Sequence, residues 1–162
     1  MSAIGHFVPE VMGLGTSTVL GAVSGEYVLY FALIILIGKI LATSVSLGFG
    51  FFGGVFSPAL LVGASAGAVV AELFVVVGFL EKFEPALVVS GMAAVTGAVI
   101  GAPLCMVVIV MELTSSYIYA LASLVGLTLS VSLSHILFGA SYFDRQLGAR
   151  GCLLYTSPSP RD

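Results

Sequence analysis

The chain has 162 residues, of which 59% are hydrophobic and 8% are charged, with a formal net charge of −3 at pH 7. Soluble domains carry about 25% charged residues, so this composition, with a mean hydropathy of +1.20, indicates a membrane protein. The small negative charge and the lack of a basic run exclude nucleic acid as a partner, and two cysteines make neither a disulfide framework nor a metal site.

Glycine and proline divide the apolar sequence into helices of unequal length. We expect helices over residues 16–23, 27–47, 58–80, 86–100, 104–113, 118–138 and 142–150. Three of them reach the roughly 20 residues needed to cross a bilayer. The helices over 86–100 and 104–113 reach only about 22 Å and 15 Å at 1.5 Å per residue. Interrupted helices at membrane depth are typical of a transporter site, although a bundle of tilted helices without transport activity fits as well.

The segment Gly53-Gly54-Val55-Phe56-Ser57-Pro58 lies between the first two long helices and predicts an anion site. Glycine lets a backbone approach a ligand closely, because it has no Cβ. We expect the next helix to begin at Pro58, which suits a first helical position, with Ser57 as its N-cap. The unpaired N–H groups and the positive dipole end of such a helix hold an anion without a buried positive charge.

Small residues at four-residue spacing predict close helix crossings within the chain, with a seam between two copies as the alternative. These pairs are Gly21/Gly25, Gly63/Gly67 and Gly97/Gly101. We expect Cys105 to be a buried small hydrophobe. Lys39, inside the first long helix, is either an attractor for anions or a side chain that pairs or reaches an interface. Glu112 and His135 are expected to be structural, with proton relay by Glu112 and titration of His135 as the alternatives.

Five stretches of sequence, taken in order, match the motifs of one family of membrane proteins. Gly54–Pro58 resembles the G-x-F-x-P signature of the CLC family of chloride channels and chloride/proton antiporters. Residues 9–15 resemble the P-E-V-x-G-x-G segment before it, residues 91–104 the G-M-x-A and A-P-L segment after it, and residues 111–114 the following E-(M/L)-T. Residues 144–151 resemble the last membrane helix, so the resemblance covers about residues 8–151.

The resemblance implies an all-α integral membrane fold, in which residues 1–151 are similar to most of the second inverted repeat of a CLC-type subunit. It implies a multi-pass homodimer in a lipid bilayer, of a bacterial-type inner membrane with a cytoplasmic C-terminus. The transported ion is chloride or a related monovalent anion, and we expect no enzymatic activity and no cofactor. Residues 152–162 resemble a translated sequencing adapter, and we expect them to be a non-native, disordered tail.

In the CLC family the amides of the x and F positions face the anion, which here are Val55 and Phe56. Gly54, Ser57 and Pro58 complete the motif, and the ring of Phe56 is expected beside the pathway. The family also has a chloride-binding tyrosine at the start of the final helix. Counting back from Arg150 places Phe143 there with Tyr142 next to it, and both are candidates.

Two motifs of the family, G-S-G-I-P and G-R-E-G-P, do not occur in this sequence. They carry the pore serine and the gating glutamate, so a channel and a proton-coupled antiporter are both open. A different secondary transporter with broken helices, and a membrane-embedded fragment that is inactive by itself, are the two other hypotheses.

Overall fold

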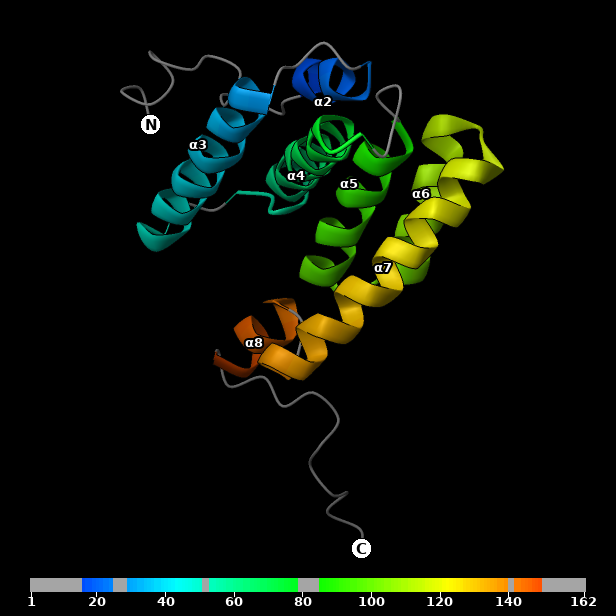
Figure 1. The fold of residues 1–162 in the computed structure, drawn as a ribbon. Helices are drawn as coiled ribbons and strands as arrows, with labels where there is room; N and C mark the ends of the chain where they lie inside the picture. The colour runs from blue at the N-terminus through cyan, green and yellow to red at the C-terminus, as the bar shows by residue number, and fades with distance from the viewer. Residues whose placement is uncertain (1–15, 25–28, 51–52, 79–84, 140–141, 150–162) are drawn as a thin grey trace, which may run out of the picture.

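The computed structural model describes residues 16–24, 29–50, 53–78, 85–139 and 142–149 (Figure 1). These described residues form α-helices and contain no strand, so the expected all-helical fold is confirmed. The helices are α2 (Thr16–Val23), α3 (Leu29–Gly48), α4 (Phe56–Val76), α5 (Pro85–Ile100), α6 (Pro103–Thr114), α7 (Tyr117–Phe138) and α8 (Tyr142–Ala149).

The helices fall into two length classes, as the sequence predicts. α3, α4 and α7 have 20, 21 and 22 residues and are long and apolar enough to cross a membrane. α5 and α6 have 16 and 12 residues, which corresponds to about 24 Å and 18 Å. Gly101 has a φ of 77° and Pro103 begins α6, so the break between these two short helices combines a left-handed glycine with a helix-starting proline.

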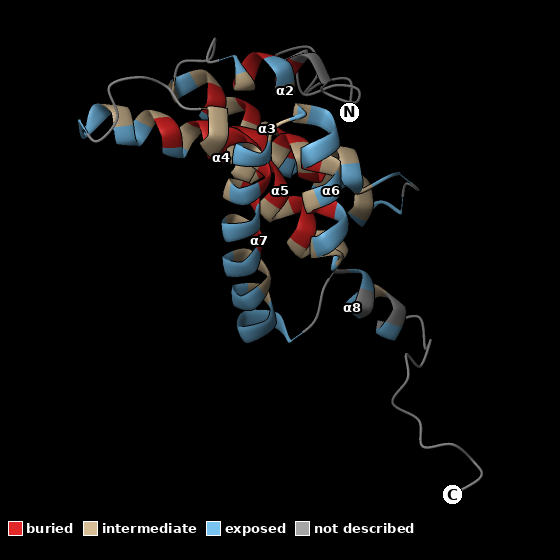
Figure 2. Cartoon of the chain, turned by 90° about the vertical axis from the view of Figure 1, so that its right-hand side faces the viewer, coloured by how far each residue is buried: buried red, intermediate tan, exposed pale blue. Residues whose placement is uncertain are grey.

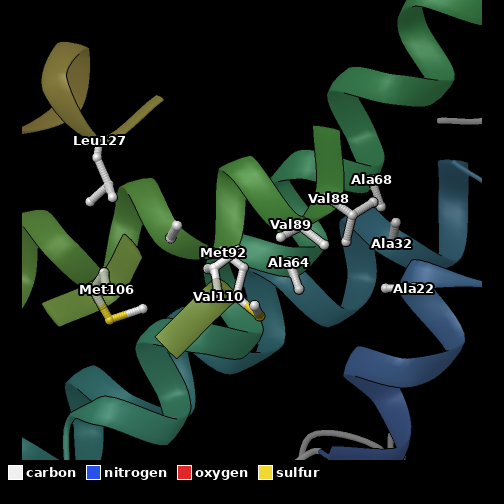
Figure 3. Packing of buried hydrophobic residues seen from close by; sticks show 11 residues of the cluster. Ala22, Ala32, Ala64, Ala68, Val88, Val89, Met92, Met106, Val110 and Leu127 are labelled. Atoms are coloured by element: carbon white, nitrogen blue, oxygen red, sulfur yellow. The ribbon is translucent and has the colours of Figure 1, made fainter. Parts of the chain in front are cut away.

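α5 is the central helix of the chain. It packs on α4 and α7 most extensively, and also on α6, α2 and α8. Figure 3 shows the side chains that meet around it, and most of them are small. This buried cluster comprises Ala22, Ala32, Ala64, Ala68, Val88, Val89, Met92, Ala93, Met106, Val110 and Leu127.

Glycine allows α4 and α5 to cross at backbone contact. A Cβ on Gly63 would lie 2.6 Å from the carbonyl oxygen of Gly91, and one on Gly67 would lie 2.6 Å from that of Leu87. Gly91 is equally constrained, because its Cβ would lie 2.7 Å from the oxygen of Gly63. The Gly63/Gly67 pair therefore packs helices within one chain, as expected for small residues in a membrane bundle.

α7 crosses α5 on one narrow face. The buried residues of α7 are Ala120, Ser123 and Leu127. The Leu127 side chain packs against Gly97 of α5 and occupies the space that a Cβ on this glycine would need. The Ser90 hydroxyl donates a hydrogen bond of 3.1 Å to the carbonyl of Ala122, which joins the same two helices. The rest of α7 is largely exposed (Figure 2), and it carries large apolar side chains that suit a lipid environment.

Candidate anion-binding site

The G-x-F-x-P segment forms the start of α4, two residues earlier than expected. Val55 is the N-cap and Phe56 the first helical residue, because the carbonyl of Val55 already accepts a hydrogen bond of 3.1 Å from the N–H of Ala59. The prediction that Ser57 caps this helix was therefore wrong, since Ser57 lies inside the first turn. Pro58 is the third helical residue, where its missing N–H removes no helical hydrogen bond.

The first turn of α4 presents backbone donors at an open end of the helix. The N–H groups of Val55 and Phe56 precede the first i to i−4 bond, which the N–H of Ala59 donates, so neither donates an intrahelical hydrogen bond. They lie at the positive end of the dipole of a 21-residue helix. The Phe56 side chain is 39% exposed and Val55 is partly buried. The arrangement places amide donors and an aromatic ring at one accessible point.

The fold of the described residues does not require glycine at the two positions before this turn. A Cβ on Gly53 or Gly54 would meet nothing within 4 Å, and neither residue has a left-handed φ. Gly63 and Gly67, further along α4, are in contrast pressed against backbone. Glycine at positions 53 and 54 leaves the space beside this part of the backbone open.

The second part of the predicted site lies at the start of α8. Tyr142 is the first residue of this helix and Phe143 the second. The Phe143 ring is 38% exposed, whereas the side chain of Tyr142 lies outside the described residues. α8 packs on α5, and α4 packs on α5 and α3, so the two parts of the site occupy separate helices with α5 as a common neighbour.

Four further polar side chains occupy different environments. Lys39 is 6% exposed, on the face of α3 that packs against α4, so it does not extend to the surface of this chain. Glu112 and His135 are exposed. Cys105 is also exposed, and the prediction that it is buried was wrong. In a membrane helix the outer face is as apolar as the inner one, so apolar neighbours do not identify a buried position.

Sequence reasoning did not predict a hollow of about 420 Å³ between α5, α7 and α8. It is mostly apolar, and its lining also includes three polar side chains. The lining residues are Val95, Ala98 and Val99 of α5, Ser130, Leu133, Ser134, Leu137 and Phe138 of α7, and Arg145 of α8. The available signal was the spacing of Val95 and Val99 on α5 and of Leu133 and Leu137 on α7, each four residues apart. That spacing places each pair on one helix face.

Comparison with known proteins supports the motif assignment. A family model described as voltage-gated chloride channel matches residues 1–135. The chain belongs to the voltage-gated chloride channel (CLC) family. The matched range includes the Gly54–Pro58 segment and ends before Tyr142. With three helices of spanning length, this membership makes the chain an integral membrane protein.

The relatives of the chain include bacterial and archaeal members. It is 35% identical over 104 residues to the protein MJ0305 of Methanocaldococcus jannaschii, a match covering 64% of this chain and 25% of that protein. It is 26% identical over 142 residues to the H(+)/Cl(−) exchange transporter ClcA of Vibrio parahaemolyticus, covering 87% and 30%. For ClcA of Vibrio cholerae the identity is 29% over 143 residues, covering 87% and 30%. The chain spans between a quarter and a third of the length of these relatives.

Proposed function

We propose that the chain is part of a CLC-type subunit that transports chloride, with the anion held by the backbone amides of Val55 and Phe56. Membership of the family and the names of the two ClcA relatives support chloride as the transported ion. The observation that carries the proposal is the geometry of the start of α4. There, amide donors outside the helical ladder follow two glycines that the fold itself does not need.

The chemistry of this turn suits reversible binding of an anion during transport better than tight, permanent binding. Amide donors and a helix dipole attract chloride without a full positive charge. Conduction requires binding that is firm enough for the ion to enter and weak enough for it to leave. The ring of Phe56 is apolar and partly exposed beside the donors, so it narrows the pathway next to the bound ion. Gly54, Ser57 and Pro58 shape the backbone around it, and a phenol or ring from Tyr142 or Phe143 completes the site.

The assembly and location follow from the same proposal. The subunit forms a homodimer in a bacterial-type plasma membrane, and each subunit has its own pathway. Arg145 and Arg150 follow the last long helix, which supports a cytoplasmic C-terminus. The protein is a transporter without enzymatic activity or a resident cofactor. Proton movement coupled to chloride, as in the relatives named exchange transporters, would make it an antiporter.

Chloride efflux from liposomes containing the full-length subunit tests the proposal. Gly54→Ala adds a methyl group in front of the donors, and we expect efflux to fall at least about tenfold, the loss of roughly one charge-assisted hydrogen bond. Gly48→Ala, whose Cβ also meets nothing within 4 Å, is the matched control and should leave efflux unchanged.

Two further variants examine the ring. Phe56→Trp enlarges the ring beside the donors and should slow efflux, whereas Phe49→Trp alters a ring that is 80% exposed at the end of α3 and should not. Efflux that is indifferent to both Gly54→Ala and Phe56→Trp would contradict the placement of the anion. A pH electrode in the same experiment records whether protons move with chloride.

A further inference from the structure

α8 depends on contacts with the rest of the chain for its position. It has eight residues, and isolated helices shorter than about 12 residues are marginal in water. Its first two residues, Tyr142 and Phe143, are the candidates for the second part of the anion site. The direction in which this part of the helix faces is therefore set by the contacts that fix the rotation of α8 about its own axis.

One such contact joins α8 to the last residue of α7. The guanidinium carbon of Arg145 lies 5.8 Å from the centroid of the Phe138 ring, which is a cation–π contact. Directly after Phe138, Gly139 has a φ of 74°, and its N–H donates a hydrogen bond of 2.9 Å to the carbonyl of His135. This left-handed glycine ends α7, so the Phe138 ring is carried by the last turn of a 22-residue helix.

Arg145 and Phe143 project from nearly opposite sides of α8. They are two residues apart, which is about 200° around a helix of 3.6 residues per turn. Arg145 and Phe138 both line the hollow between α5, α7 and α8, so Phe143 lies on the side of α8 away from this hollow. The two side chains belong to one helical turn, so a rotation of α8 that separates Arg145 from Phe138 would turn Phe143 through the same angle.

The direction of the Phe143 ring matters for an anion. An aromatic ring has a negative face and a positive edge. Phenylalanine has no hydroxyl that could donate a hydrogen bond to a ligand, so only the edge of its ring attracts chloride. A phenylalanine at the start of α8 therefore needs a more closely fixed helix than a tyrosine would.

We propose that Arg145 is a positioning residue for the anion site. Its stack on Phe138 holds α8 in the rotation that presents the edge of the Phe143 ring to chloride. This inference rests on the proposed function, because the start of α8 must supply the second part of the site. The guanidinium acts through Phe138 and α8, without contact to the anion. A purely electrostatic role of Arg145 would need its charge and not the ring of Phe138, so the two roles are separable.

A double-mutant cycle at Phe138 and Arg145 of the full-length subunit tests the proposal. Chloride affinity is measured by isothermal titration calorimetry, with the unfolding midpoint as a check on the fold. A cation–π contact at an exposed arginine predicts that Arg145→Gln and Phe138→Leu each weaken chloride binding about two- to fivefold. The double variant should bind no more weakly than either single variant, because both remove the same contact. Arg145→Lys keeps a cation over the ring and should bind chloride like the wild type, and so should the control Arg150→Gln.

The surroundings of the ring are observed directly with para-fluorophenylalanine in place of Phe143. In chloride-free buffer, its fluorine resonance should move in the same direction in Arg145→Gln and Phe138→Leu and stay in place in Arg145→Lys. A resonance that is unchanged in all three variants would overturn the proposal, since α8 would then keep its rotation without the stack. Loss of affinity in Arg145→Gln with full affinity in Phe138→Leu would also overturn it, because charge alone would explain that result.

Gly54→Ala in the same titration separates this proposal from the proposed function. If Gly54→Ala weakens chloride binding and Arg145→Gln does not, the positioning role is overturned and the proposed site at the start of α4 stands. If neither variant changes chloride affinity, both proposals fail.

Discussion

The α4–α5 crossing makes the sharpest prediction about stability. In Gly67→Ala, the new Cβ would lie 2.6 Å from the carbonyl oxygen of Leu87, 2.7 Å from the Cα of Val88 and 3.1 Å from the oxygen of Val88. All three are backbone atoms of a helix, so no side chain can rotate away. To restore ordinary van der Waals contact near 3.4 Å, α4 and α5 must separate by about 0.8 Å.

The magnitude follows from two opposing effects. Overpacking of this kind costs about 1–3 kcal/mol, and alanine recovers about 1 kcal/mol of helix propensity. The net expectation is a loss of up to about 2 kcal/mol in the free energy of unfolding, and Gly67→Ala should be about 1–3 kcal/mol less stable than Gly48→Ala. Gly48→Ala is the matched control, because its Cβ meets nothing within 4 Å and it gains only the propensity term.

The measurement is unfolding of the full-length subunit by sodium dodecyl sulfate in mixed micelles, followed by circular dichroism. Gly67→Ala should unfold at a lower detergent fraction than wild type, and Gly48→Ala at the same fraction or a higher one. Gly63→Ala, whose Cβ would lie 2.6 Å from the oxygen of Gly91, should behave like Gly67→Ala. If Gly67→Ala were as stable as Gly48→Ala, the close crossing and the central position of α5 would be refuted.

Three other predictions concern the α5–α7 contact and the chain in isolation. The Leu127 side chain is 1% exposed, so Leu127→Ala should destabilise the subunit by about 2–4 kcal/mol, because contacts are lost and a cavity forms. Leu129 is 68% exposed, and Leu129→Ala should change stability by less than about 0.5 kcal/mol. Equal effects of the two variants would contradict the packed face of α7. Ser90→Ala removes the 3.1 Å hydrogen bond to Ala122 and should cost about 0.6 kcal/mol in the same unfolding measurement, and a value above 2 kcal/mol would point to a larger role for this hydroxyl. The 162-residue chain alone in chloride-loaded liposomes should show no efflux above protein-free vesicles, since the start of α4 supplies only one part of the proposed site. Efflux at the full-length rate would overturn that expectation.

Much of the fold could be predicted because glycine and proline mark the helix ends. Gly101 and Pro103 separate α5 from α6 in both the sequence and the structure. The start of α4 was placed two residues late, because proline is tolerated anywhere in a first helical turn and therefore does not fix the N-cap. Ser57 has the side chain of a good cap, but the backbone of Val55 already begins the helix.

Burial was harder to predict than helix position. In a soluble protein, large apolar side chains mark the core, but here Leu104, Ile118 and Leu121 are exposed while Gly63 and Ala64 are buried. Lipid is as apolar as the interior, so small residues that allow close approach indicate the buried faces. Cys105 was misplaced because apolar neighbours do not identify the buried face of a membrane helix, whereas the contact made by Gly63 and Gly67 was anticipated.

The proposed anion site could be predicted from sequence only in its local part. The motif at Gly54–Pro58 predicts the proposed donors because a helix start is determined by neighbouring residues. The hollow beside Arg145 depends on how three helices meet, and no local pattern specifies their arrangement. Its apolar spacing on α5 and α7 is the same as that of any lipid-facing helix.

Replacing the backbone amide of Phe56 by an ester tests the proposed anion site most directly. The ester removes one N–H donor and keeps the ring, and the carbonyl of Val55 remains an acceptor for Ala59, so the helix start is retained. Chloride affinity of the full-length subunit is then measured by isothermal titration calorimetry, with the unfolding midpoint as a check on the fold. Loss of a hydrogen bond to a charge predicts affinity about 10- to 100-fold weaker at an unchanged midpoint. Chloride affinity equal to that of the unmodified protein would contradict the binding of the anion by this amide.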